Sequence, residues 1–168
     1  KTSDVNATPD GTAPTISSVS LASDNSTLAV TFSEAVYNTN GGSGSLEVAD
    51  FAFSISGGAA TLGSATPSSI SSSGNVYTLG ISLSGTPNGS ETLTVNPVDD
   101  SIYDMAGNEV STSQSNNTAT LNDKAAPTIS SVSLASDNST IAVTFSEAVY
   151  NTNGGSGSLE VADFAFSI

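Results

Sequence analysis

The chain contains no cysteine and no histidine, and only two of its 168 residues, Lys1 and Lys124, are basic. Without cysteine there is neither a disulfide framework nor a thiolate zinc site, and a cysteine nucleophile is excluded. Sixteen acidic residues outweigh the two lysines and give a net charge of −14. Because nucleic acids are bound through Lys and Arg contacts to phosphate, we expect no nucleic-acid partner, and the charge balance favours cations as ligands.

Long apolar runs and catalytic residue types are also scarce. No run approaches the roughly 20 apolar residues that a membrane helix needs, so we expect no membrane insertion. Carboxylate pairs such as Asp99 with Asp104 could serve glycoside hydrolysis, but that chemistry needs a sugar-binding cleft, and the chain has no tryptophan and no arginine to build one. The sequence therefore predicts a protein that is not an enzyme.

One long segment occurs twice. Residues 13–55 return as residues 126–168, and the single difference is Leu28 in the first copy against Ile141 in the second. A near-perfect repeat of this length indicates domains in tandem. We therefore divide the chain into a leader or linker at 1–12, a complete repeat at 13–125, and the N-terminal part of a second, near-identical repeat at 126–168.

Within the repeat, apolar residues alternate with Ser and Thr, as in Leu28, Val30 and Phe32. A period of two is typical of strands that are buried on one face. The expected strands are 15–21, 27–33, 50–55, about 60–65, 76–84, 91–97 and 117–122. Seven short strands separated by turn residues, in about 100 residues, favour an all-β fold of the immunoglobulin-like β-sandwich class.

The expected strand order brings distant loops together. Successive strands run up and down, so the segments that follow the second and sixth strands return to the end where the first strand begins. We therefore expect residues 33–35 and 98–116 to lie near Asp10.

The acidic loop at 98–109 (VDDSIYDMAGNE) suggests a calcium site at that end. Calcium takes six to eight oxygen ligands from carboxylates, carbonyls and Asn side chains. The alternative is that these Asp, Asn and Gly residues only form turns, which they favour for local reasons. The expected ligands in the first repeat are Asp10, Glu34, Asp99, Asp100, Asp104 and Asn108, and those at the next junction are Asp123 and Glu147.

Four motifs occur in a fixed order: Asp-x-x-Ala-Pro at 10–14, Thr-Phe-Ser-Glu-Ala-Val at 31–36, Ala-Asp-Phe at 49–51 and Asp-Met-Ala-Gly-Asn at 104–108. Together they resemble the bacterial Ig-like tandem-repeat domains of large extracellular adhesins and related surface repeat proteins. The resemblance implies a structural extender, located outside the cell or on its surface, in which calcium stiffens the domain junctions. It implies a calcium role for Asp10 and Asp123 by motif match, and less directly for Asp104 and Asn108.

Two other functions stay open. Residues 126–168 hold only the first three expected strands, which would expose an apolar face and unpaired edges. The chain could thus be a subunit of a self-assembling extracellular filament, in which a neighbouring chain completes the partial repeat. A carbohydrate-binding module is the third possibility and would need an exposed aromatic pocket. The expected partners are neighbouring repeats of the same chain or identical chains.

Overall fold

The computed structural model describes residues 10–167, so residues 1–9 of the expected leader lie outside the described residues. The chain is all-β, as predicted, and its paired strands are antiparallel. Its contacts divide it into unit 1, residues 1–124, and unit 2, residues 125–168, and each is described by itself. None of the helices in the described part combines the length and apolarity that a membrane span requires.

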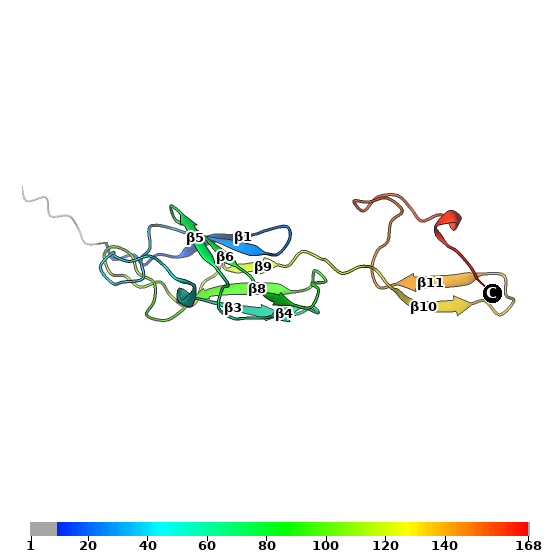
Figure 1. Cartoon of the computed structure of the whole chain (residues 1–168), viewed down its shortest axis with the longest axis horizontal. Coiled ribbons are helices and arrows are strands. Elements are labelled where there is room, and N and C mark those ends of the chain that lie inside the picture. Colours follow the sequence, from blue (N-terminus) through cyan, green and yellow to red (C-terminus); the bar gives the residue numbers. More distant parts are fainter. Residues whose placement is uncertain (1–9, 168) are drawn as a thin grey trace, which may run out of the picture. The chain divides into compact units, whose positions relative to one another are not determined.

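Unit 1 contains two main sheets, which Figure 1 shows as one layer with β1, β5 and β6 and another with β3 and β8. The first sheet has the order β1 (Ile16–Leu21), β2 (Thr27–Phe32), β6 (Val76–Gly80), β5 (Ile70–Ser73). The second has the order β3 (Phe51–Ser56), β8 (Thr92–Pro97), β9 (Thr118–Thr120). The short strands β4 (Thr61–Leu62) and β7 (Leu83–Ser84) pair separately, and a 3₁₀ turn, η1 (Val48–Asp50), precedes β3.

The core of unit 1 lies between these sheets. Strands β2 and β8 bury every second residue, as the alternation in the sequence predicts. At the centre, the rings of Phe32, Phe51 and Tyr77 lie with their centroids 5.7 to 6.4 Å apart. Because Phe51 belongs to one sheet and the other two rings to the opposite sheet, the aromatic cluster joins the layers. The arrangement is consistent with a β-sandwich.

Two strand expectations were wrong in detail. The expected strand at 76–84 is divided in two: β6 ends at Gly80, where its partner β2 begins at Thr27, and Leu83 and Ser84 form β7, which pairs with β4 instead. Strand β5 was not predicted. It is an edge strand that pairs with β6 and exposes three serines, so its sequence carries no alternation of apolar and polar residues.

A buried carboxylate fixes one end of β8. Glu91 is 0% exposed, and its carboxylate accepts hydrogen bonds from the N–H groups of Ala59, Ala60 and Asn88 at 2.7 to 3.1 Å. Burial by itself would raise the pKa of Glu91, but these hydrogen bonds outweigh it and lower the pKa to about 2. Gly58, with φ +62°, is required here because a Cβ would lie 2.1 Å from the Glu91 Cδ atom.

Unit 2 repeats the first part of unit 1. Strands β10 (Ile129–Leu134) and β11 (Ile141–Phe145) pair in the same register as β1 and β2, and η2 (Val161–Asp163) corresponds to η1. Residues 164–167 have the sequence that begins β3, yet they form no strand. In unit 1 the ladder partner of β3 is β8, and unit 2 contains no counterpart of β8 among its described residues.

The repeat provides a matched pair of core substitutions. Phe53 is 4% exposed, whereas its counterpart Phe166 is 74% exposed. Phe53→Ala should lower the free energy of unfolding by about 3 to 5 kcal/mol because it leaves a cavity. Phe166→Ala should change it by less than about 0.5 kcal/mol. Denaturant titration followed by circular dichroism measures both, and equal costs would contradict the difference in packing.

The Glu91 cradle predicts a specific acid response. Because the folded pKa of Glu91 lies below the value of 4.5 for a free glutamate, its contribution to stability is complete above about pH 4.5 and is lost as the pH falls towards 2. Glu91→Gln should cost about 2 to 3 kcal/mol at pH 7, since it removes the charge that strengthens these hydrogen bonds and puts an NH₂ donor in place of one of the two acceptor oxygens. This cost should shrink over that pH range. Exposed Asp99, changed to Asn, is the control, and a cost for Glu91→Gln that does not change with pH would contradict the assignment.

Candidate metal site

Three carboxylates from distant parts of unit 1 converge at one end of the sandwich. Each of Asp10, Glu34 and Asp104 offers an oxygen that lies within 4.8 Å of those of the other two. Asp10 precedes β1, Glu34 follows β2, and Asp104 follows β8. The loops after the second and sixth expected strands thus lie beside Asp10, as the up-and-down order of the strands predicts.

Backbone pairing between the two loops brings Glu34 and Asp104 together. The Tyr37 N–H donates to the Tyr103 carbonyl at 2.7 Å, and the Tyr103 N–H donates to the Tyr37 carbonyl at 2.8 Å. Buried Val36 and Ile102 anchor these loops in the core next to the paired residues. The pairing was not foreseen, because backbone hydrogen bonds between loops require no particular side chain.

Separate hydrogen bonds hold the leading segment against the same end. The Thr15 N–H donates to the Ser33 hydroxyl at 3.0 Å, and the Ser33 N–H donates to the Thr15 carbonyl at 2.9 Å. Further out, the Asn108 side-chain amide donates to the Asp10 carbonyl at 3.1 Å. The position of Asp10 therefore depends on contacts with the body of unit 1.

Asp104 is the buried member of the cluster, with 1% of its surface exposed. Its two carboxylate oxygens accept hydrogen bonds from the Asn108 backbone N–H at 2.8 Å and the Asn108 Nδ2 at 2.7 Å. Burial would raise the pKa of Asp104, but the bonds from the Asn108 side chain and backbone, with those from Gly107 and Ala106, lower it overall. Asp104 is therefore held in its charged form.

Glu34 bears the electrostatic cost of this arrangement. Its pKa is raised, first by desolvation and then by the negative charges of Asp10 and Asp104. Mutual repulsion of carboxylates disfavours their charged forms, and a divalent cation among them reverses its sign. A divalent cation among the three carboxylates would therefore offset this repulsion.

The chemistry of the donors fits a hard cation. Asp10, Glu34 and Asp104 line a hollow together with Met105 and Ala106, so the polar side chains in it offer only oxygen atoms as possible ligands. Oxygen-only sets suit calcium or magnesium, whereas zinc and copper prefer nitrogen and sulfur. Calcium needs six to eight oxygens, which the three carboxylates can complete with water.

Asp99 and Asp100 do not join this cluster. Both are exposed in the loop directly after β8. Asp100 has φ +56°, and its backbone N–H donates to the Glu109 carboxylate at 2.7 Å. Both residues lie in a turn, in keeping with the alternative interpretation of the acidic loop, and their expected role as ligands stays a prediction. Asn108 donates hydrogen bonds to Asp10 and Asp104 and so positions them. The sequence motif that contains Asn108 does not tell such a positioning role from a role as a metal ligand.

The remaining two expected ligands lie elsewhere. Asp123 lies next to Gly89, where an added Cβ would come within 3.3 Å of the Asp123 Cβ atom, and the neighbouring Lys124 N–H donates to the Pro87 carbonyl. Asp123 is thus near the start of β8, whereas Asp104 follows its end. Glu147 belongs to unit 2 and is partly buried. The expected pairing of Asp123 with Glu147 stays a prediction.

Comparisons of the chain with models of protein families, with curated proteins and with solved structures found no match. The resemblance to bacterial surface repeats therefore depends on the four sequence motifs, and the candidate metal site depends on the geometry of Asp10, Glu34 and Asp104.

Proposed function

We propose that the chain is a structural, non-enzymatic extender module of a bacterial cell-surface or secreted repeat protein, stiffened by calcium at the junctions between repeats. One observation carries the proposal: Asp10, from the segment that leads into the repeat, meets Glu34 and Asp104 of the repeat itself. A cation held by all three would connect the leading segment to the sandwich.

The order of the strands supports an immunoglobulin-like repeat. In that fold, strands A, B, E and D form one sheet and C, F and G the other. The orders β1-β2-β6-β5 and β3-β8-β9 correspond to these two sheets when the short β4–β7 pair is set aside. Such domains form extended arrays when they are joined in tandem, and the sequence repeat is in keeping with this.

Charge gives calcium a mechanical role in such an array. Residues 13–125 carry ten acidic residues and a single lysine, so successive repeats repel one another. A cation at each junction would neutralise part of that charge where the chain is most easily bent. At ten times its dissociation constant, calcium would add about 1.4 kcal/mol of stability for each site. This is small beside a folding free energy but sufficient to order a short linker.

A filament subunit completed by a neighbouring chain is the second candidate, favoured by the exposed apolar residues of unit 2. The number of copies of each half of the repeat argues against a filament. Residues 13–168 contain two copies of the first half of the repeat and one copy of the second half. Within these residues, a neighbour that donated residues 57–122 would uncover its own residues 13–55, so an exchange of this segment alone gains no buried surface. We therefore favour the extender.

Calcium should stabilise the chain through the three converging carboxylates. We expect the melting temperature to rise with millimolar calcium and to fall again with chelator, as measured by calorimetry. Asp104→Asn should abolish the rise because it removes a ligand charge. Asp99→Asn is the matched control from the same loop, and it should leave the rise intact. Equal losses in both variants would mean that calcium acts on net charge and not at this site.

Without metal, removing the charge of Glu34 should have the opposite effect. Because the folded pKa of Glu34 is raised, the folded state disfavours its ionisation, and stability decreases as the pH rises through that pKa. Glu34→Gln should therefore raise the melting temperature by a few degrees at pH 7 in chelator, while it removes the response to calcium. A variant that melts lower than the wild type in chelator would show that Glu34 does not experience this repulsion.

A further inference from the structure

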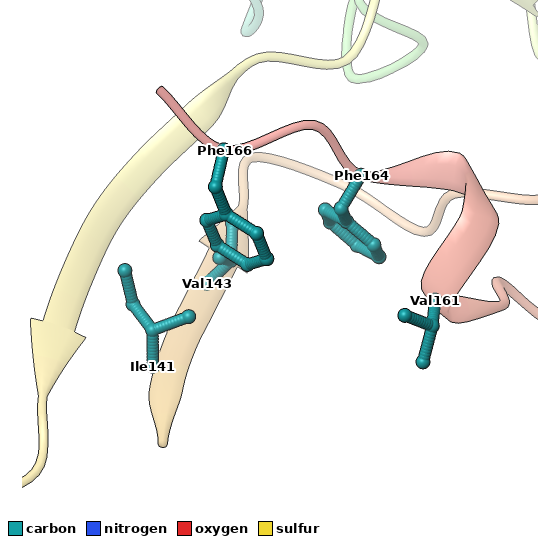
Figure 2. A pocket seen from close by; sticks show the side chains of 5 residues that line it. All are labelled: Ile141, Val143, Val161, Phe164 and Phe166. Atoms are coloured by element: carbon teal, nitrogen blue, oxygen red, sulfur yellow. The ribbon is translucent and has the colours of Figure 1, made fainter. Parts of the chain in front are cut away.

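Unit 2 presents an apolar hollow whose lining is shown in Figure 2. Ile141 and Val143 come from β11, Val161 from η2, and Phe164 and Phe166 from the segment that follows. Large parts of these side chains are exposed: 40% of Ile141, 74% of Phe166 and 87% of Val161. A surface of this kind usually marks an interaction site.

The repeat identifies what covers these positions in unit 1. The counterparts of Ile141, Val143, Phe164 and Phe166 are Leu28, Val30, Phe51 and Phe53, all of which are 4% exposed or less. They belong to one core cluster with residues of β6 and β8, namely Tyr77, Leu79, Leu93 and Val95. The segment between 57 and 122 thus buries in unit 1 the residues that are open in unit 2.

The open face already has the geometry of the closed one. The rings of Phe145 and Phe164 lie 6.5 Å apart at 47°, and their counterparts Phe32 and Phe51 lie 6.3 Å apart at 48°. In unit 1 the third ring of the cluster is Tyr77, whose hydroxyl donates to the Val36 carbonyl. Among the described residues of unit 2 this third ring is missing. The receiving surface is therefore preorganised for an aromatic side chain.

An asparagine also differs between the units, since it is covered in unit 1 and exposed in unit 2. Asn25 has φ +62° and is 3% exposed, because its side chain exchanges hydrogen bonds with the backbone of Asn122 at 2.8 and 2.9 Å. Its counterpart Asn138 keeps the same left-handed conformation, with φ +59°, but is exposed. In unit 1 the partner of this asparagine belongs to the same 57–122 segment.

The backbone edges are open as well. Strand β2 lies between β1 and β6, whereas within the described residues β11 pairs with β10 alone. Residues 164–167 have the sequence of β3 but no ladder partner. Exposed edges of this kind are templates for an added strand.

We propose that unit 2 is the receptor for a second-half segment, meaning a polypeptide with the sequence of residues 57–122. The segment adds one strand to β11, with its Tyr77 opposite Val143 and its Leu79 opposite Ile141, as Tyr77 and Leu79 pair with β2 in unit 1. It adds a second strand to residues 164–167, with its Val95 opposite Phe166. The occupant must be additional to residues 57–122 of the same molecule, since those already cover unit 1.

The test is an NMR titration of the isotope-labelled full chain with an unlabelled synthetic peptide of residues 57–122. We expect one peptide to bind per chain and to protect the amides of 141–145 and 164–167 from exchange. The methyl signal of Met105, the single methionine, reports on unit 1 and should not move. A peptide with Tyr77→Ala should bind at least about tenfold more weakly, because it lacks the ring that completes the aromatic cluster.

Two chain variants control for non-specific adsorption. Val143→Asp places a charge on the receiving face and should abolish binding, whereas Thr144→Asp, on the opposite face of β11, should preserve it. Equal binding of both variants, or of both peptides, would overturn the proposal. Dimerisation of the chain through Val143 without binding of the peptide would also overturn the proposal, because the apolar face would then be covered by the same face of a second copy. None of these outcomes affects the calcium proposal, which is measured at Asp10, Glu34 and Asp104.

Discussion

The packing of two apolar sheet faces against each other is the constraint on which the rest of this structure depends. With no cysteine and few charges of opposite sign, the repeat has neither disulfides nor a network of ion pairs to hold it together. Its cohesion comes from alternate residues of β2, β3, β6 and β8, and from the three rings of Phe32, Phe51 and Tyr77 that join the layers. Each sheet alone leaves that apolar surface in water, which is the condition of unit 2. Each half of the repeat therefore needs the other half to bury its apolar surface.

The same packing creates the acidic cluster. Once the sheets are stacked, the segment before β1 and the loops after β2 and β8 share one end of unit 1. The backbone pairing of Tyr37 with Tyr103 joins the two loops, and the carboxylates of Asp10, Glu34 and Asp104 then lie close to one another. The pKa values of two members of the cluster shift in opposite directions. Hydrogen bonds from Asn108 hold Asp104 in its charged form, while Glu34 is left with the repulsion. Folding energy from the core thus maintains an arrangement that is unfavourable by itself, and perturbed carboxylates of this kind are common at functional sites.

How far the sequence could predict this structure differs from one feature to another. Alternation located β2 and β8 almost to the residue, because these strands bury one face fully and leave the other partly exposed. It missed β5, whose serines pair through the backbone at a sheet edge, and it extended the strand at 76 beyond Gly80. For the acidic cluster, the strand order predicted that Asp10, Glu34 and Asp104 would share one end. It could not separate them from Asp99 and Asp100, since composition and spacing do not tell which way a loop residue faces.

The sequence by itself determined the repeat, the period of two and the surplus of negative charge, because these are properties of the order of residues alone. Tertiary structure decided the rest, and the repeat demonstrates it. The same residues form strand β3 in unit 1 and an irregular segment at 164–167 in unit 2, and the same phenylalanine is buried at 53 and exposed at 166. The physical reason is that a strand obtains its hydrogen bonds and its buried surface from distant partners, so a local sequence specifies what it can pair with but not whether the partner is present.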